Sequence, residues 1–323
     1  MTPPSALTVP RQVYCILSAR ALPYARDALS SLLARAREPL RLRLVTDGAE
    51  DEQALRQALV EIGVPDRHRV SVHAQAEIDD LAATAFQGLP HLQAFRHGHP
   101  CWRKITDPLV MAAEGEEMVI LDPDLYFPND FSFEPTPASG ILLMWQPPSC
   151  LLPHEVVMRA YDEGFALAHH VDIGVGHARR NLDLAWLDHL VARLGGRELP
   201  RQMHVEAIVW AALAMREGGG YLPPEHWHCW QNRQWKRLAL KLGAPGEALL
   251  AVDPFDRIKC FHGGGAAKWW VPGRVSSGRM PPASPVLQHL PPAPFEPLTR
   301  QAYLKTRRWK DLAARLGYYR LMA

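Results

Sequence analysis

The N-terminal part of the chain alternates between strand and helix patterns, which restricts its possible folds more than any other feature. Short apolar or alternating runs predict strands at residues 13–17, 40–46 and 70–72. Apolar residues at helical spacing predict helices over residues 22–37 and 51–62. A strand–helix–strand–helix–strand order implies a parallel sheet with right-handed crossovers. We therefore expect an α/β fold in which helices flank a central sheet.

A later apolar run ends in two carboxylates. Residues 118–121 are all apolar, which suits a strand buried on both faces, and Asp122, Pro123 and Asp124 follow directly. Open α/β sheets bind their ligands beyond the carboxyl ends of their strands. Two carboxylates separated by one residue can converge on a hard cation, although Asp-Pro-Asp is also ordinary turn chemistry. This stretch alone leaves a metal site and a solvated turn as alternatives.

Composition narrows the class of protein. The 323 residues are 47% hydrophobic and 22% charged, as in soluble globular proteins, and the net charge of +2 gives no general attraction to nucleic acid. No glycine-rich dinucleotide or P-loop motif follows the first predicted strand. The five cysteines form no CxxC pair, and no signal peptide or membrane-spanning run is recognisable. These features predict a cytoplasmic protein.

The rest of the chain carries further predicted elements. Residues 77–117 are expected to be mainly helical, with the last helix starting at Asp107 and Pro108, and residues 223–235 are expected to form a loop. The remaining predicted strands are 140–145, 170–177 and 258–262, and the remaining predicted helices are 154–163, 182–194 and 205–216. Proline and serine are frequent in residues 272–298, which indicates an extended linker before a basic, aromatic helix over 299–323.

A second motif supports the metal interpretation. Residues 262–270 read His-x-x-Gly-x-x-Lys-x-Trp and follow a predicted strand. An imidazole such as His262 can complete a metal shell beside two carboxylates. Gly264 and Gly265 allow backbone N–H groups to approach phosphate oxygens, and Lys268 offers a mobile positive charge. A diphosphate bound to a divalent cation needs such a set of groups.

In order and spacing, these motifs resemble the glycosyltransferases of family 8, which include glycogenin and bacterial lipopolysaccharide galactosyltransferases. The resemblance spans about residues 13–270. The family pattern is a Lys before a helix, Asp-x-Asp after a strand, Asn-x-Gly-Val, an acid on a helix, and His-x-x-Gly-x-x-Lys-Pro-Trp. The matching positions are Lys104, Asp122, Asp124, Asp172, Gly174, Val175, Glu206, His262, Gly265, Lys268 and Trp270. The chain departs from the pattern at Asp172 in place of Asn, at Ala207 in place of Gln, and at Trp269 in place of Pro.

The resemblance implies a fold and a donor. The fold would be a GT-A-type nucleotide-diphospho-sugar transferase with a mixed, mostly parallel sheet. Residues 1–271 would form the transferase domain, with a nucleotide-binding half over 12–130 and an acceptor half over 131–271. The donor would be a nucleotide-diphosphate sugar, expected to be a UDP-sugar, and the acceptor a glycan or lipid-linked hydroxyl in surface glycan synthesis. Transfer would retain the configuration at the sugar's anomeric carbon.

The resemblance also implies roles for individual residues. Mn²⁺ or Mg²⁺ would be held by Asp122, Asp124 and His262. Asp172 or Glu206 would orient the acceptor hydroxyl. The remaining predicted donor-binding residues are Ala19, Arg20 and Asp47 near the base and ribose, and Lys104, Gly264, Gly265 and Lys268 near the diphosphate.

Several alternatives remain open from the sequence. The fold could belong to a nucleotide-sugar-binding protein that has lost transfer activity, or to a nucleotidyltransferase, although residues 17–22 lack the glycine-rich loop of that class. The candidate ligands of a structural zinc site are His226, His228, Cys229, Cys260 and His262. The C-terminal helix could lie on an anionic membrane surface, or it could pack on the domain through Trp309 and Leu312.

Overall fold

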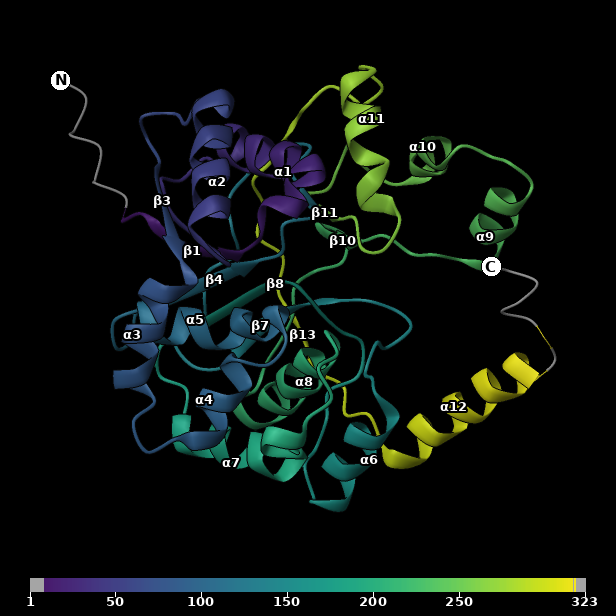
Figure 1. The fold of residues 1–323 in the computed structure, drawn as a ribbon. Helices are drawn as coiled ribbons and strands as arrows, with labels where there is room; N and C mark the ends of the chain where they lie inside the picture. The colour runs from purple at the N-terminus through teal and green to yellow at the C-terminus, as the bar shows by residue number, and fades with distance from the viewer. Residues whose placement is uncertain (1–8, 316, 318–323) are drawn as a thin grey trace.

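A central sheet of eight strands lies between two groups of helices in the computed structural model, which describes residues 9–315 and 317 (Figure 1). The strand order is β13-β9-β7-β8-β4-β1-β2-β3. The strands of this sheet are β1 (Arg11–Ile16), β2 (Leu40–Thr46), β3 (Arg69–Ala74), β4 (Glu117–Leu121), β7 (Ile141–Trp145), β8 (Val171–Arg179), β9 (Gly219–Tyr221) and β13 (Ala293–Pro294). The expected α/β fold with a mixed sheet is confirmed.

The N-terminal half follows the predicted strand and helix alternation. Strands β1, β2, β3 and β4 pair in parallel, with β1 between β2 and β4. Helices α1 (Leu22–Arg35) and α2 (Ala49–Ile62) provide the crossovers β1-α1-β2 and β2-α2-β3. Because consecutive parallel strands end at the same edge of the sheet, residues that follow β1, β2 and β4 gather there.

The C-terminal half adds antiparallel pairs to this sheet. Strand β8 pairs antiparallel with both β4 and β7, whereas β7 and β9 are parallel. Helices on the far face from α1 and α2 bury the sheet on that side, as Figure 1 shows. These helices are α3 (Gln75–Ala85), α4 (Pro90–Arg96), α5 (Arg103–Met111), α6 (His154–Asp162), α7 (Leu184–Leu194) and α8 (Val205–Glu217).

Strand β4 is buried on both faces, as its sequence predicts. Met118 and Ile120 belong to the apolar cluster that packs against α5, α7 and α8. Val119 and Leu121 belong to the cluster on the opposite face, which packs against α1 and α2. The alternation of side chains along a strand sends successive residues into these two cores. The strand therefore fixes the position of the carboxylates that follow it.

A small second sheet joins the C-terminal segment to the region after β4. It has the order β10-β11-β5, with β10 (Trp227–Cys229), β11 (Cys260–His262) and β5 (Leu125–Tyr126). The prediction that residues 223–235 form only a loop is wrong, because β10 pairs in parallel with β11. A three-residue strand between buried aromatic residues carries too little periodic pattern to be recognised from sequence.

Helix α5 also begins earlier than predicted. Its first residue is Arg103, and Pro108 lies within the helix instead of starting it. Proline inside a helix costs a backbone hydrogen bond. Here the residues from Arg103 to Leu109 are all buried, so packing against β1 and β4 outweighs the local preference.

The segment expected to be a linker packs along the domain. Helix α11 (Val271–Ser276) starts it, β12 (Pro285–Val286) pairs with β6 (Asp130–Phe131), and β13 joins the edge of the main sheet through β9. Proline is tolerated at such edge positions because one side of the strand needs no N–H donor. The division into a 1–271 domain and a 272–298 linker remains a prediction.

Helix α12 (Arg300–Arg315) follows this segment and projects beyond α6 in Figure 1. Trp309 is 66% exposed and Leu312 is 45% exposed, so the expected packing through these two side chains is wrong. Tyr303 anchors the helix instead, stacked on His154. Among the described residues, none lies in a helix that is both long and apolar enough to cross a bilayer.

Candidate active site

The three predicted metal ligands converge at the carboxyl ends of β4 and β11. His262 Nε2 lies 3.3 Å from Asp124 Oδ1 and 3.8 Å from Asp122 Oδ2. The antiparallel pairing of β5 with β11 places His262 opposite Leu125, and the Gly263 amide donates to the Asp124 carbonyl over 3.0 Å. The small sheet therefore holds together two motifs that are far apart in the sequence.

The donor set of this cluster fits a divalent cation. Two carboxylates and an imidazole suit Mn²⁺ or a similar ion. Asp124 Oδ1 is buried, and among the described residues it has an ion pair with His262 Nε2 but no well-aligned hydrogen bond. A buried carboxylate oxygen without a hydrogen bond is costly unless a ligand satisfies it. The residues present thus provide an incomplete oxygen and nitrogen shell that a metal ion would complete.

Asp172 lies on the other side of the His262 ring. His262 Nδ1–H donates to Asp172 Oδ1 over 2.8 Å, and the Gly174 amide donates to the same carboxylate over 2.9 Å. Gly174 leaves room for the ring, because a Cβ there would lie 2.6 Å from His262 Nδ1. This contact fixes the tautomer that leaves His262 Nε2 facing Asp122 and Asp124.

Lys104 links Asp122 to the buried Glu206. Its Nζ donates to Asp122 Oδ1 over 2.6 Å and lies 3.1 Å from Glu206 Oε1. Burial raises the pKa of Glu206 to about 8, although the positive charge of Lys104 acts to lower it. Burial alone would lower the pKa of Lys104, but Asp122 and Glu206 raise it above its ordinary value. Lys104 is therefore a fixed cation next to the first metal ligand.

The two aspartates of the motif have different environments. Burial raises the pKa of Asp122, with Lys104 opposing and Asp124 adding to the effect. Burial also disfavours the charged form of Asp124, but His262 and Lys268 outweigh it and lower the pKa of Asp124 to about 2. Asp124 is thus the firmly ionised member of the pair.

Lys268 lies beside this cluster, with an aromatic residue that the sequence analysis missed. Its Nζ is 3.6 Å from Asp124 Oδ2 and 5.0 Å from the centre of the Tyr24 ring. Tyr24 also meets the exposed Trp269 edge to face, with ring centroids 5.0 Å apart. Tyr24 lies in the first turn of α1, and only its place shortly after β1 could have indicated a role. The side chain closes one side of the site.

The loop after β11 has the conformation that its glycines predict. Gly265 has a φ of +68°, in the left-handed region that glycine accepts without strain. At Gly263 a Cβ would lie 3.3 Å from the Asp124 carbonyl oxygen. At Gly264 a Cβ would lie 3.8 Å from His262 Nε2, an ordinary contact distance. The loop can therefore approach a ligand closely through its backbone.

The residues predicted near the base and ribose lie at the same edge of the sheet. Ala19 and Arg20 form a short 3-10 turn (η1, Ala19–Ala21) after β1, and Asp47 follows β2. Arg103, buried at the start of α5, makes an ion pair with Asp47 and donates to Gln75 Oε1 over 3.1 Å. Arg103 thus couples Asp47 to the helix that carries Lys104.

The structure does not gather the alternative zinc ligands. His228 Nε2 is 3.3 Å from Asp253, and His226 Nδ1 is 3.9 Å from Glu134. Among residues 9–315 and 317, the potential metal clusters contain neither of these histidines nor Cys260. Cys229 does lie near His262 and Asp172, but all three are buried and Asp172 already accepts from the ring.

Comparison with known proteins identifies the fold. No protein-family model matches the sequence, and no curated protein sequence matches it significantly. The apo crystal structure of mouse xyloside xylosyltransferase 1 is similar in fold, with a TM-score of 0.52 and 15% identity, over 80% of this chain and 99% of that one. The galactosyltransferase LgtC with donor and acceptor sugar analogues has a TM-score of 0.46 and 12% identity, over 83% and 96% of the two chains. The chain therefore has the fold of a GT-A-type nucleotide-sugar transferase, in agreement with the resemblance in its motifs.

Proposed function

We propose that this chain is a metal-dependent glycosyltransferase that moves a sugar from a nucleotide-diphosphate donor, a UDP-sugar, to a hydroxyl group. The observation that carries the proposal is the convergence of Asp122, Asp124 and His262 beside Lys268, at the carboxyl edge of the sheet. Such an edge is where open α/β folds bind nucleotides. The fold shared with a xylosyltransferase supports the same class of reaction.

Three aspartates gather around one imidazole at this site. Asp122, Asp124 and Asp172 all lie near His262, Lys104 pairs with Asp122, and Lys268 lies near Asp124. A bound Mn²⁺ or Mg²⁺ would act as a Lewis acid that neutralises the leaving diphosphate. Lys268 and the amides of Gly264 and Gly265 would stabilise the charge that grows on the same group.

Asp172 and Glu206, which were expected to orient the acceptor hydroxyl, act instead as positioning residues in this proposal, because both are buried and contact His262 and Lys104. Asp172 holds the His262 ring through the 2.8 Å hydrogen bond, so that Nε2 faces the two aspartates. Glu206 is fully buried and holds Lys104 against Asp122. The acceptor hydroxyl would attack from the face of the sugar that the diphosphate leaves, with retention of configuration. The acceptor would be a glycan or a lipid-linked sugar.

The nucleotide would lie over the ends of β1 and β2. Ala19, Arg20 and Asp47 are the residues proposed for the base and ribose, with Asp47 positioned by Arg103. Tyr24 and Lys268 would border the diphosphate, because the Lys268 ammonium lies over the Tyr24 ring. A cation over an aromatic face is held by the ring quadrupole and remains available to a phosphate.

Thermal stabilisation by UDP tests the proposal most directly. Mn²⁺ should increase the rise in melting temperature caused by UDP, and Asp124→Asn should abolish that increase, because it removes the charge of a metal ligand with little change in shape. Asp256→Asn is the matched control, since Asp256 is exposed and its side chain makes no hydrogen bond among the described residues. An unchanged Mn²⁺ effect in Asp124→Asn would overturn the metal assignment.

Product analysis separates the remaining alternatives. Incubation with Mn²⁺ and a set of UDP-sugars should release UDP, with or without an acceptor. Release of pyrophosphate would instead identify a nucleotidyltransferase. Nucleotide binding with no turnover of any donor or acceptor would identify a binding protein that has lost transfer.

We also propose a peripheral contact between α12 and the inner face of a membrane. The helix carries six Lys or Arg residues among its sixteen and exposes Trp309 and Leu312. Basic residues beside exposed apolar ones are typical of helices that bind anionic lipid surfaces. Such a contact would bring the domain to a lipid-linked acceptor.

A further inference from the structure

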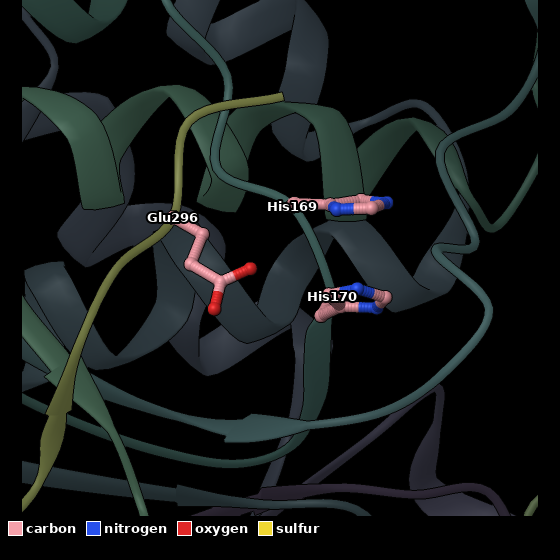
Figure 2. Close-up of side chains that lie close together, drawn as sticks. All are labelled: His169, His170 and Glu296. Carbon is pink, nitrogen blue, oxygen red and sulfur yellow. The ribbon is translucent and has the colours of Figure 1, made fainter. Parts of the chain in front are cut away.

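Two adjacent histidines meet a glutamate from a distant segment, outside the site described above. One ligand atom from each of His169, His170 and Glu296 lies within 4.8 Å of the others. Figure 2 shows the two imidazole rings one over the other, with the Glu296 carboxylate across from them on the neighbouring segment. The rings are partly exposed and the carboxylate is exposed, so solvent ions can reach the cluster.

Backbone hydrogen bonds hold the two segments together. The His169 amide donates to the Glu296 carbonyl over 2.7 Å, and the Leu298 amide donates to the Leu167 carbonyl over 2.8 Å. The Tyr221 hydroxyl lies between the segments, where it donates to the His169 carbonyl and accepts from the Glu296 amide. The backbone of the cluster is therefore fixed without any contribution from the three side chains.

The His170 ring is already oriented as a ligand. Its Nδ1–H donates to the Gln146 carbonyl over 3.1 Å, which leaves the lone pair on Nε2 available. A histidine that binds a metal commonly donates its other ring N–H to a backbone carbonyl in this way. His170 also has a φ of +54°, the one positive φ outside glycine among the described residues, and the backbone hydrogen bond from Gln146 N to its carbonyl holds that conformation.

The other two side chains have no competing polar partner. Among residues 9–315 and 317, the His169 ring and the Glu296 carboxylate take part in no hydrogen bond or ion pair. The His169 and His170 rings stack with centroids 3.6 Å apart. Two stacked imidazoles repel if both are protonated, which favours the neutral form that binds metals.

We propose that His169, His170 and Glu296 form a second metal site, for Zn²⁺ or a similar transition-metal ion. Two imidazoles and one carboxylate suit such ions and leave a fourth position for water. The metal would clamp the segment that leads to α12 onto the start of β8. This site is independent of the donor metal site and does not require the proposed transferase activity.

A Zn²⁺ titration of the full chain tests the site. Asp124→Asn serves as the background, because it removes the donor metal site, and Co²⁺ serves as a second, spectroscopic probe. The background variant should bind one equivalent of Zn²⁺, and added His170→Asn or Glu296→Gln should weaken that binding by ~10-fold or more. Co²⁺ should give a visible absorption band that both substitutions remove.

The variants are chosen so that folding is preserved. Asn tolerates the left-handed backbone of His170 better than most other non-glycine residues, and Gln has the shape of Glu296. His97→Asn is the control, because His97 is an exposed histidine outside the cluster. Equal Zn²⁺ affinity in the background, His170→Asn and Glu296→Gln proteins would overturn the proposal. Failure of the transferase proposal would leave this titration unchanged, since the background already lacks the donor site.

Discussion

His262 connects the two sides of the candidate active site through its two ring nitrogens. Burial alone would lower the pKa of this histidine, but Asp172 and Asp124 raise it well above its ordinary range. The imidazole is therefore protonated when no metal is bound, and metal binding must displace that proton. Asp172 and Asp124 attract opposite nitrogens of the ring. The position of the ring therefore depends on the residues packed around it as well as on its charge.

The space beside His262 depends on one glycine. We predict that Gly174→Ala weakens Mn²⁺-dependent UDP binding by roughly 10-fold or more, a loss typical of disturbed support around a metal ligand. The new Cβ would lie 2.6 Å from His262 Nδ1 and 3.0 Å from Asp172 Oδ1, so the ring would have to leave its hydrogen bond. Isothermal titration with UDP at saturating and zero Mn²⁺ measures the effect.

The same strand provides the control for this substitution. Gly176 lies two residues further along β8, and a Cβ there would lie 3.4 Å from Leu143, an ordinary contact distance. Gly176→Ala should leave Mn²⁺-dependent binding within about twofold of the unsubstituted protein. Equal losses in both variants would show that the strand, and not the His262 ring, is sensitive to added volume.

His177 should make stability depend on pH. Burial lowers the pKa of His177 well below 6.5, and Arg11 adds to the effect, so the unfolded chain binds a proton more readily than the folded chain. Its contribution is complete above pH 6.5 and is lost as the pH falls from there towards the folded-state pKa, by up to about 1.4 kcal/mol per pH unit. Urea unfolding between pH 5 and 7.5 should show a shallower slope for His177→Gln. An unchanged slope would assign the pH dependence to other groups.

At the scale of elements, the sequence predicts the helices and strands whose formation depends on local periodicity. The segments from β1 to β3 and the buried strand β4 follow directly from periodicity, because each buries apolar side chains at a regular spacing. The start of α5 and the strand β10 do not follow from periodicity. Burial of Arg103 determines where α5 begins, and pairing with β11 determines β10. The two edge pairings of residues 272–298 are likewise invisible in a proline-rich sequence.

In the candidate site, too, some contacts could be predicted from the sequence and others could not. The order of the two motifs, their ligand chemistry and their resemblance to family 8 predicted that Asp122, Asp124, His262 and Lys268 lie together, and the structure brings them together. The same reasoning assigned Asp172 and Glu206 to the acceptor hydroxyl, so it did not show that Asp172 bonds to His262 or that Glu206 is buried behind Lys104. Tyr24 was missed because its partner Lys268 is far from it in the sequence and no motif links the two residues.

At the scale of the whole molecule, residues near the start of α12 anchor it to the domain. Tyr303 is buried, its hydroxyl lies 3.3 Å from His154 Nδ1, and Arg300 pairs with Asp162 over 2.8 Å. Beyond this anchor the helix exposes basic and aromatic side chains. Substitutions on this exposed part of α12 can therefore be made without disturbing the contacts that anchor the helix.

We predict that Lys305→Glu with Arg308→Glu lowers binding to vesicles that contain phosphatidylglycerol by about 10-fold or more, because each basic residue near an anionic surface contributes about 1 kcal/mol. Both residues are exposed and lie beyond Tyr303, so stability and UDP binding should stay unchanged.

Trp309→Ser should also weaken vesicle binding, because it removes the exposed indole. The matched control is Trp235→Ser, since Trp235 is an exposed tryptophan on α9 (Gln234–Lys241). Vesicle sedimentation with and without anionic lipid measures the difference. Equal sedimentation of the unsubstituted protein and the three variants would mean that α12 contacts no membrane. The structure would then give no support for a lipid-linked acceptor.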